Sequence, residues 1–182
     1  MSLINKRRYA PTNQNGEQVN DSKVDLSHLS TVPWGEAMIP KIKEFLEMEV
    51  NFGQLTTYFE AMKAEDREKK HWGIISLRKL LSIQVNTPIQ SVIDHNVVPL
   101  LITFMTNPQE PHLQVEATWC ITNMASGTTE QTASLVEKGV IPILVQLLQS
   151  THVTLIEQAI WGVGNIAGDC ASFRDKLLDA GA

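Results

Sequence analysis

One nine-residue motif occurs twice in this chain, and the repeat limits the folds that the chain can adopt. WCITNMASG begins at Trp119, and WGVGNIAGD begins at Trp161, 42 residues later. Each copy has an asparagine four positions after the tryptophan, at Asn123 and Asn165. On an α-helix this spacing puts both side chains on one face, one turn apart. The repeat therefore predicts two structural units, each with a Trp/Asn pair on the same face of a helix.

The residues before each motif repeat as well, and they predict the architecture of one unit. Val98-Pro99 aligns with Ile141-Pro142, 43 residues later. Both prolines stand where the first turn of a helix does not need their missing N–H. Asn96 and Gly139 tolerate the left-handed conformation that closes a preceding helix. We therefore expect three helices per unit: a short one, a buried one that begins near the proline, and a longer one that carries the Trp/Asn pair.

A period of about 42 residues with three helices per unit is typical of the armadillo/HEAT class of α-solenoids. We predict an all-α superhelix in which neighbouring units stack, because one unit cannot bury its own apolar face. The third helices would line a concave surface. The predicted organisation is a disordered polar tail (1–33), an atypical first repeat (about 34–86), a second (about 87–128), a third (about 129–169) and the start of a fourth (170–182).

Composition excludes several function classes. The net charge of −5 argues against nucleic acid as the main partner, because phosphate binding needs a basic face. The two cysteines form no metal or redox motif, and the five histidines are scattered along the chain, so no metal and no cofactor is expected. No apolar run approaches the roughly 20 residues of a membrane helix, so no membrane is expected as a partner. No nucleotide-binding loop or nucleophile motif occurs, and an enzyme is not expected.

The repeated segments resemble importin-α, the adaptor family that carries cargo bearing a nuclear localisation signal. EATWCITNMASGTTEQT (116–132) and EQAIWGVGNIAGD (157–169) are similar to its second and third armadillo repeats. LRKLLSIQVNTPIQSVIDHNVVPLL (77–101) is similar to the first repeat and the opening of the second. The resemblance implies the N-terminal part of a nuclear import adaptor that works in cytoplasm and nucleus and whose full-length form pairs with importin-β.

The resemblance also implies roles for single residues. The two repeated tryptophans would hold the stems of cargo lysines and arginines, and the two asparagines would bond the cargo backbone. The remaining contacts would be polar, with an acid for the main lysine: Ser126, Gly127, Thr132, Gln158 and Asp169. The chemistry agrees, because a Lys or Arg stem is apolar with a charged tip. An indole adds a cation–π contact of roughly 0.5–2 kcal/mol, and a carboxamide both donates and accepts hydrogen bonds.

Each of these features also has a structural interpretation. The asparagines could bond turn backbone, Ser126-Gly127 could only end a helix, and Asp169 could cap a helix that begins near Ala171. Trp34 and Trp72 have no asparagine partner, and we expect them to be packing residues.

The chain departs from the family pattern in its first repeat and at its N-terminus. Ser76 and Leu80 stand where the first Trp/Asn pair would be, so the series of Trp/Asn pairs starts in the second repeat. Gln84 stands where the family often has an acid. Lys6-Arg7-Arg8 is a single short basic cluster, whereas the importin-β-binding segment of the family has several. The cluster is either a solvated tail or an autoinhibitory mimic of cargo in the groove.

Two further interpretations stay open. The alternative function is an armadillo scaffold or assembly protein without a transport role, which would bind partners without needing basic residues. The expected fourth unit is incomplete, and its exposed apolar face would favour a homodimer.

Overall fold

The structure is a computed structural model that describes residues 24–83 and 85–182. Within these ranges every regular element is a helix, which confirms the all-α prediction. The two repeated units each hold three helices, as predicted. The elements in chain order are η2 (Ser27–Thr31), α1 (Gly35–Glu47), η3 (Phe52–Gln54), α2 (Leu55–Lys63), α3 (Arg67–Ser82), α4 (Ile89–Asp94), α5 (Val98–Met105), α6 (Pro111–Met124), α7 (Thr129–Glu137), α8 (Val140–Leu147), α9 (Val153–Ala167) and α10 (Ala171–Asp179).

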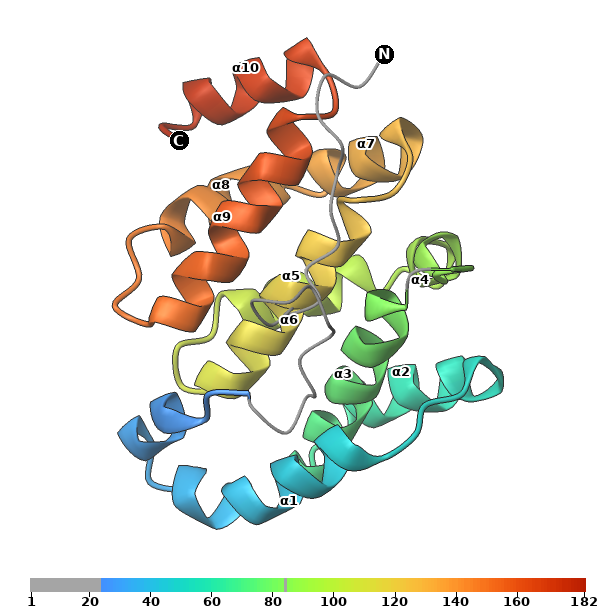
Figure 1. The fold of residues 1–182 in the computed structure, drawn as a ribbon, viewed down its shortest axis with the longest axis vertical. Helices are drawn as coiled ribbons and strands as arrows, with labels where there is room; N and C mark the ends of the chain where they lie inside the picture. The colour runs from blue at the N-terminus through green and yellow to red at the C-terminus, as the bar shows by residue number, and fades with distance from the viewer. Residues whose placement is uncertain (1–23, 84) are drawn as a thin grey trace, which may run out of the picture.

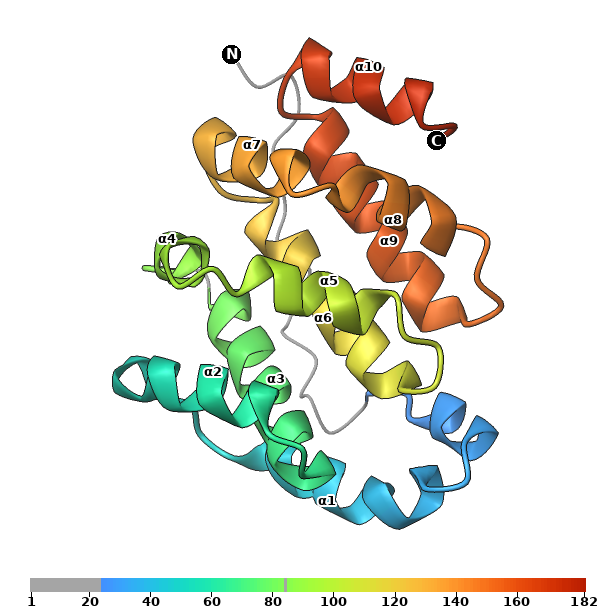
Figure 2. The ribbon, with the colours of Figure 1, turned by 180° about the vertical axis from the view of Figure 1, so that it is seen from behind.

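Successive units stack so that equivalent helices lie side by side. The helices α3, α6 and α9 form one row, and α6 contacts both of its neighbours (Figure 1). Seen from behind, α2, α5 and α8 form a second row, each packed on the long helix of its own unit (Figure 2). None of the helices in the described ranges is long and apolar enough to cross a membrane. The stacking places the long helices of neighbouring units on one face of the molecule, called here the α3/α6/α9 face.

The turns between the first and second helices of each unit follow the predicted chemistry. Asn96 has φ 53° and Gly139 has φ 84°, so both adopt the left-handed conformation. Pro99 lies in the first turn of α5, where no helical hydrogen bond is lost. Thr128 caps α7 with a capping box completed by Gln131. Local sequence therefore decides where the helices of each unit begin and end.

Part of the predicted disordered tail is folded. We expected a disordered tail up to residue 33, but Ser27–Thr31 form the short helix η2, and its Leu29 is fully buried in the core. A Cβ atom on Gly35 would lie 1.8 Å from the carbonyl oxygen of Leu29, so η2 packs directly on the start of α1. One short turn carries too little periodicity to be recognised in a sequence. Lys6, Arg7, Arg8 and Gln84 lie outside the described residues.

Four of the five histidines, scattered along the sequence, meet in the fold. The ring of His112 on α6 stacks on His71 of α3 at 5.3 Å and on His28 of η2 at 5.6 Å between centroids. His152, before α9, lies edge-on to His28 at 6.4 Å. We call these four residues the histidine stack. Within the described ranges no group of three or more histidine, cysteine or acidic side chains is arranged to hold a metal ion.

Candidate functional site

The two repeated Trp/Asn pairs lie on neighbouring long helices. Trp119 and Asn123 are on α6, and Trp161 and Asn165 are on α9. Because α6 and α9 pack against each other, the pairs belong to adjacent units of the α3/α6/α9 face.

The four tryptophans fall into two groups. Trp34 and Trp72 pack against the contiguous cluster of buried apolar side chains, which confirms their predicted packing role. Trp119 and Trp161 are not among the residues of that cluster. Trp161 is 38% exposed, whereas Trp119 is 2% exposed. The two repeated indoles therefore differ from each other, since Trp119 is buried and Trp161 is partly exposed.

Both asparagines reach back to the long helix of the preceding unit. Asn165 Nδ2 donates to the backbone oxygen of Thr122 at 3.0 Å, and Asn123 Nδ2 donates to Ser82 Oγ at 3.1 Å. Both bonds are structural, but the acceptors are a backbone oxygen within α6 and a side chain of α3 rather than turn backbone. A carboxamide has two N–H donors and an acceptor oxygen, so this bond is compatible with a second, ligand-binding role.

The residues that follow each motif are tied into the backbone. Ser126 Oγ donates to the carbonyl oxygen of Asn123 at 2.7 Å, which supports its interpretation as a helix stop. The amide of Gly127 donates to the carbonyl oxygen of Met124 at 3.0 Å. Thr132, fully buried on α7, donates to the carbonyl oxygen of Thr128 at 3.1 Å. These residues shape the turn between α6 and α7.

Asp169 does not cap the helix that follows it. The N-cap of α10 is Cys170, so the alternative in which Asp169 is the N-cap is wrong. Asp169 is buried, and its Oδ1 accepts a hydrogen bond from Thr129 Oγ1 at 2.7 Å. The carboxylate therefore joins the end of α9 to the start of α7.

Gln158 is the one predicted site residue whose polar side chain lacks a partner among the described residues. It is fully buried, and neither Nε2 nor Oε1 has a hydrogen-bond partner there. Its backbone oxygen accepts a hydrogen bond from Thr122 Oγ1 at 2.8 Å. An unsatisfied buried amide is costly, so Gln158 is a candidate for contact with a polar ligand.

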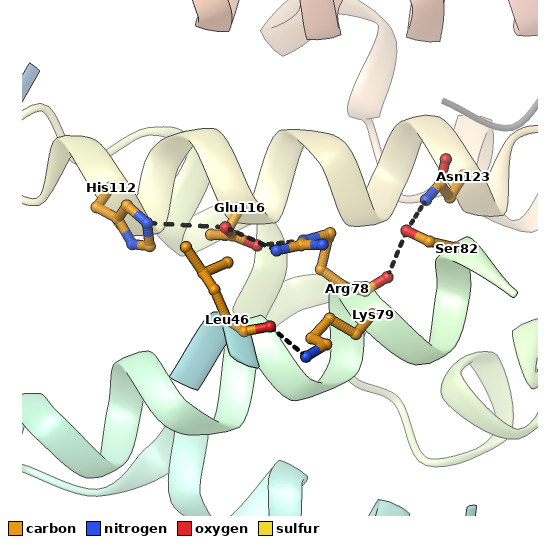
Figure 3. Close-up of polar contacts among 7 residues, drawn as sticks. All are labelled: Leu46, Arg78, Lys79, Ser82, His112, Glu116 and Asn123. Carbon is orange, nitrogen blue, oxygen red and sulfur yellow. Dashed lines mark hydrogen bonds and ion pairs between the residues drawn. The ribbon is translucent and has the colours of Figure 1, made fainter. Parts of the chain in front are cut away.

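The sequence does not predict an ion pair that lies against the Trp119 ring. Arg78 Nε donates to Glu116 Oε2 at 2.9 Å, and both side chains are almost fully buried. The Arg78 guanidinium carbon lies 4.4 Å from the centroid of the Trp119 ring. Figure 3 shows this pair and the Ser82–Asn123 bond along the same two helices. The only signal in the sequence is that Glu116 stands three positions before Trp119, on the same helix face.

Comparison with known proteins places these observations in a family. The armadillo/beta-catenin-like repeat matches residues 86–126 and 128–168. Importin subunit alpha-2 of Arabidopsis thaliana is 46% identical over 119 residues, covering 65% of this chain and 22% of that protein. Importin subunit alpha-1b of Oryza sativa subsp. japonica is 42% identical over 127 residues, covering 70% and 24%. The chain spans about a quarter of the length of these relatives.

Solved structures agree on the fold. A designed armadillo repeat protein in complex with the peptide (KR)4 has a TM-score of 0.64 at 22% identity, covering 89% of this chain and 77% of that one. A computationally designed armadillo repeat protein for modular peptide recognition has a TM-score of 0.65 at 20% identity, covering 90% and 78%. The chain therefore contains two armadillo repeats and is homologous to importin alpha subunits over about two thirds of its length.

Proposed function

We propose that this chain binds extended Lys/Arg-rich peptides of the nuclear-localisation-signal type along the α3/α6/α9 face. The protein then acts as an adaptor for import from cytoplasm to nucleus. The observation that carries the proposal is the pair of Trp/Asn motifs on the adjacent helices α6 and α9, in a chain related to importin alpha subunits.

The side chains on this face suit such a peptide. The exposed indole of Trp161 offers a surface for an alkyl stem and a cation–π contact for its charged end. Gln158 supplies a buried amide without a protein partner among the described residues, and Asp169 supplies a carboxylate for an ammonium group. The two asparagines supply carboxamides for an extended backbone, which has no hydrogen-bond partners of its own.

The spacing of the helices matches the repeat of an extended peptide. Packed helices lie about 8–10 Å apart, and an extended chain advances roughly 3.3 Å per residue. Neighbouring Trp/Asn pairs would therefore meet side chains two to three residues apart in cargo. The designed solenoid that holds (KR)4 supports the view that this fold accommodates a basic peptide.

The test is a titration of a fluorescent K-K-K-R-K peptide at low and moderate salt. We expect micromolar affinity that weakens as salt rises, because part of the attraction is between charges. Trp161→Ala and Asn165→Ala should each weaken binding by about three- to tenfold. Ile160→Ala is the matched control, since Ile160 is the neighbouring residue on α9 and is 56% exposed; it should bind like the wild type.

Three outcomes would decide the matter. Absence of binding at both salt concentrations refutes the function. Binding that is equal in the wild type and in both α9 variants refutes the mechanism. Equal binding of a peptide with glutamine in place of each lysine and arginine favours the scaffold function instead.

A further inference from the structure

We infer that Arg78 is a positioning residue for peptide binding, because it fixes the ring plane of Trp119 from the neighbouring unit. The expected effect on peptide affinity rests on the proposed function, whereas the orientation of the Trp119 ring can be tested by itself. Arg78 belongs to α3, the long helix of the unit that has no Trp/Asn pair of its own.

The guanidinium of Arg78 is held in a defined orientation. Its Nε lies 2.9 Å from Glu116 Oε2 and its Nη2 lies 3.5 Å from Glu116 Oε1, so two nitrogens face one carboxylate (Figure 3). Arg78 is 1% exposed and Glu116 is fully buried, so bulk water does not screen the pair. A planar group held by two bonds has little freedom to rotate.

The fixed guanidinium in turn constrains the indole. Its carbon lies 4.4 Å from the Trp119 ring centroid, within the range of a cation–π contact. Glu116 stands on the same face of α6 one turn before Trp119, so the ion pair and the ring form a continuous stack across the α3–α6 contact. Rotation of the Trp119 side chain would break this contact and leave a buried cation without its aromatic partner.

The helix α3 also contacts Asn123, the asparagine of the Trp119/Asn123 pair. Ser82 lies one turn after Arg78 on α3, and its Oγ donates to the Arg78 carbonyl oxygen at 2.9 Å. That Oγ accepts the hydrogen bond from Asn123 Nδ2. The first unit therefore contributes to the site through residues that orient both Trp119 and Asn123, although Ser76 and Leu80 replace its own Trp/Asn pair.

The third unit lacks this device. In the alignment that places Ser76 at the position of Trp119, Ile121 of α6 corresponds to Arg78. Ile121 carries no cation, and Trp161 is 38% exposed. Loss of the Arg78 side chain is therefore expected to affect the Trp119 ring and to leave the Trp161 ring unaffected.

The chain contains a matched control for the experiment. Arg67 lies over Trp34, also at 4.4 Å, and its Nη2 lies 3.0 Å from Glu110 Oε1. The same three residue types thus meet where Trp34 packs against the core, although the Arg67 side chain is 41% exposed. Arg67→Lys removes the same chemistry without touching the proposed site.

The experiment compares Arg78→Lys with Arg67→Lys in the full 182-residue chain. Lysine keeps a positive charge next to the buried acid but loses the planar stack and the paired hydrogen bonds. The tryptophans are replaced by 5-fluorotryptophan, and fluorine NMR signals are assigned with single Trp→Phe variants. Affinity for the K-K-K-R-K peptide is measured on the same proteins.

We expect Arg78→Lys to shift or broaden the Trp119 signal, to leave the Trp161 signal in place, and to weaken peptide binding by about three- to tenfold. Arg67→Lys should change the Trp34 signal and leave affinity within about twofold. An unchanged Trp119 signal in Arg78→Lys overturns the inference. A changed signal with unchanged affinity, in a protein whose Trp119→Ala variant binds weakly, reduces Arg78 to a structural residue and also overturns it.

Failure of the proposed function and failure of the inference about Arg78 give different results. If the wild type binds no peptide, the proposed function fails, and the NMR signals alone decide whether Arg78 fixes the ring. If Arg78→Lys does not fold, Glu116→Gln takes its place, because it removes the carboxylate charge that holds the Arg78 guanidinium. Its Trp119 signal should shift or broaden and its affinity should fall by about two- to threefold, and an unchanged Trp119 signal overturns the inference.

Discussion

The histidine stack predicts that mild acid destabilises this protein. Burial lowers the pKa of His71 from its ordinary value of 6.5 to about 4. Burial also lowers the pKa of His112 well below that value and lowers the pKa of His28. His71 and His112 are fully buried, and His71 Nε2 has no hydrogen-bond partner among the described residues. These histidines therefore bind protons less readily in the folded chain than in the unfolded chain.

The charged groups around the histidine stack have opposing effects on the pKa values of its members. Near His71, Glu110 favours the charged form, whereas Arg67 and Lys70 disfavour it. Near His112, the charge of Arg78 adds to the neighbouring histidines in disfavouring protonation, while Glu116 Oε1 lies 3.7 Å from Nε2.

Around His28, Asp25 favours protonation and His152 disfavours it. Burial is the largest cause for all three histidines, so the direction of each shift is downward.

The size of the effect follows from linkage. Above pH 6.5 His71 is neutral in both states, and its stability contribution is complete. Between pH 6.5 and about 4 only the unfolded state takes up the proton, so the free energy of unfolding falls by about 1.4 kcal/mol per pH unit. His71 alone therefore removes about 1 kcal/mol by pH 5.5 and roughly 3 kcal/mol by pH 4. His28 and His112 act in the same direction.

The assay is urea denaturation at pH 7.5, 6.5 and 5.5 for the wild type and His71→Phe. Phenylalanine keeps an aromatic ring in the stack but cannot be protonated. Between pH 7.5 and 5.5 the wild type should lose about 1 kcal/mol more than the variant. His95→Gln is the control, because His95 is exposed and lies outside the stack; it should follow the wild type. Equal losses in wild type and His71→Phe would refute the reasoning.

Three further predictions follow from the packing. Gly35→Ala should lower the free energy of unfolding by about 1–3 kcal/mol, because its Cβ would overlap the carbonyl oxygen of Leu29; urea denaturation measures this. Gly164→Ala should raise it by about 0.5–1 kcal/mol in the same assay, because its Cβ meets nothing within 4 Å in the middle of α9; a decrease would contradict this. Cys120 should react with a thiol reagent only after unfolding, because burial raises its pKa and blocks access, whereas half-buried Cys170 should react in the native protein; two equally fast thiols would argue against the fold around α6.

Much of the fold could be predicted because its signals are local. Gly139 and the proline three positions later mark the turn before α8 and the first turn of that helix, and α8 does begin at Val140. The pairing of Trp161 with Asn165 needs only the period of one helix. The number of helices per unit and the face that carries each pair follow from such short-range rules.

Local rules failed where stacking brings distant residues together. Asp169 precedes a helix and looks like a cap in the sequence, but it accepts its hydrogen bond from Thr129, 40 residues earlier. η2 was assigned to the tail because a single turn has no periodicity, yet Leu29 is buried in the core.

The sequence by itself therefore determined the repeat, its three-helix unit and the register of the Trp/Asn pairs, because each depends on spacing within one unit. Only the tertiary structure decided that Arg78 lies over Trp119 and that His28, His71, His112 and His152 share one stack. Those contacts join residues of separate units whose separations in the sequence are unequal, so no periodic pattern indicates them. They exist because stacked helices pack side chains from neighbouring units into the same buried space.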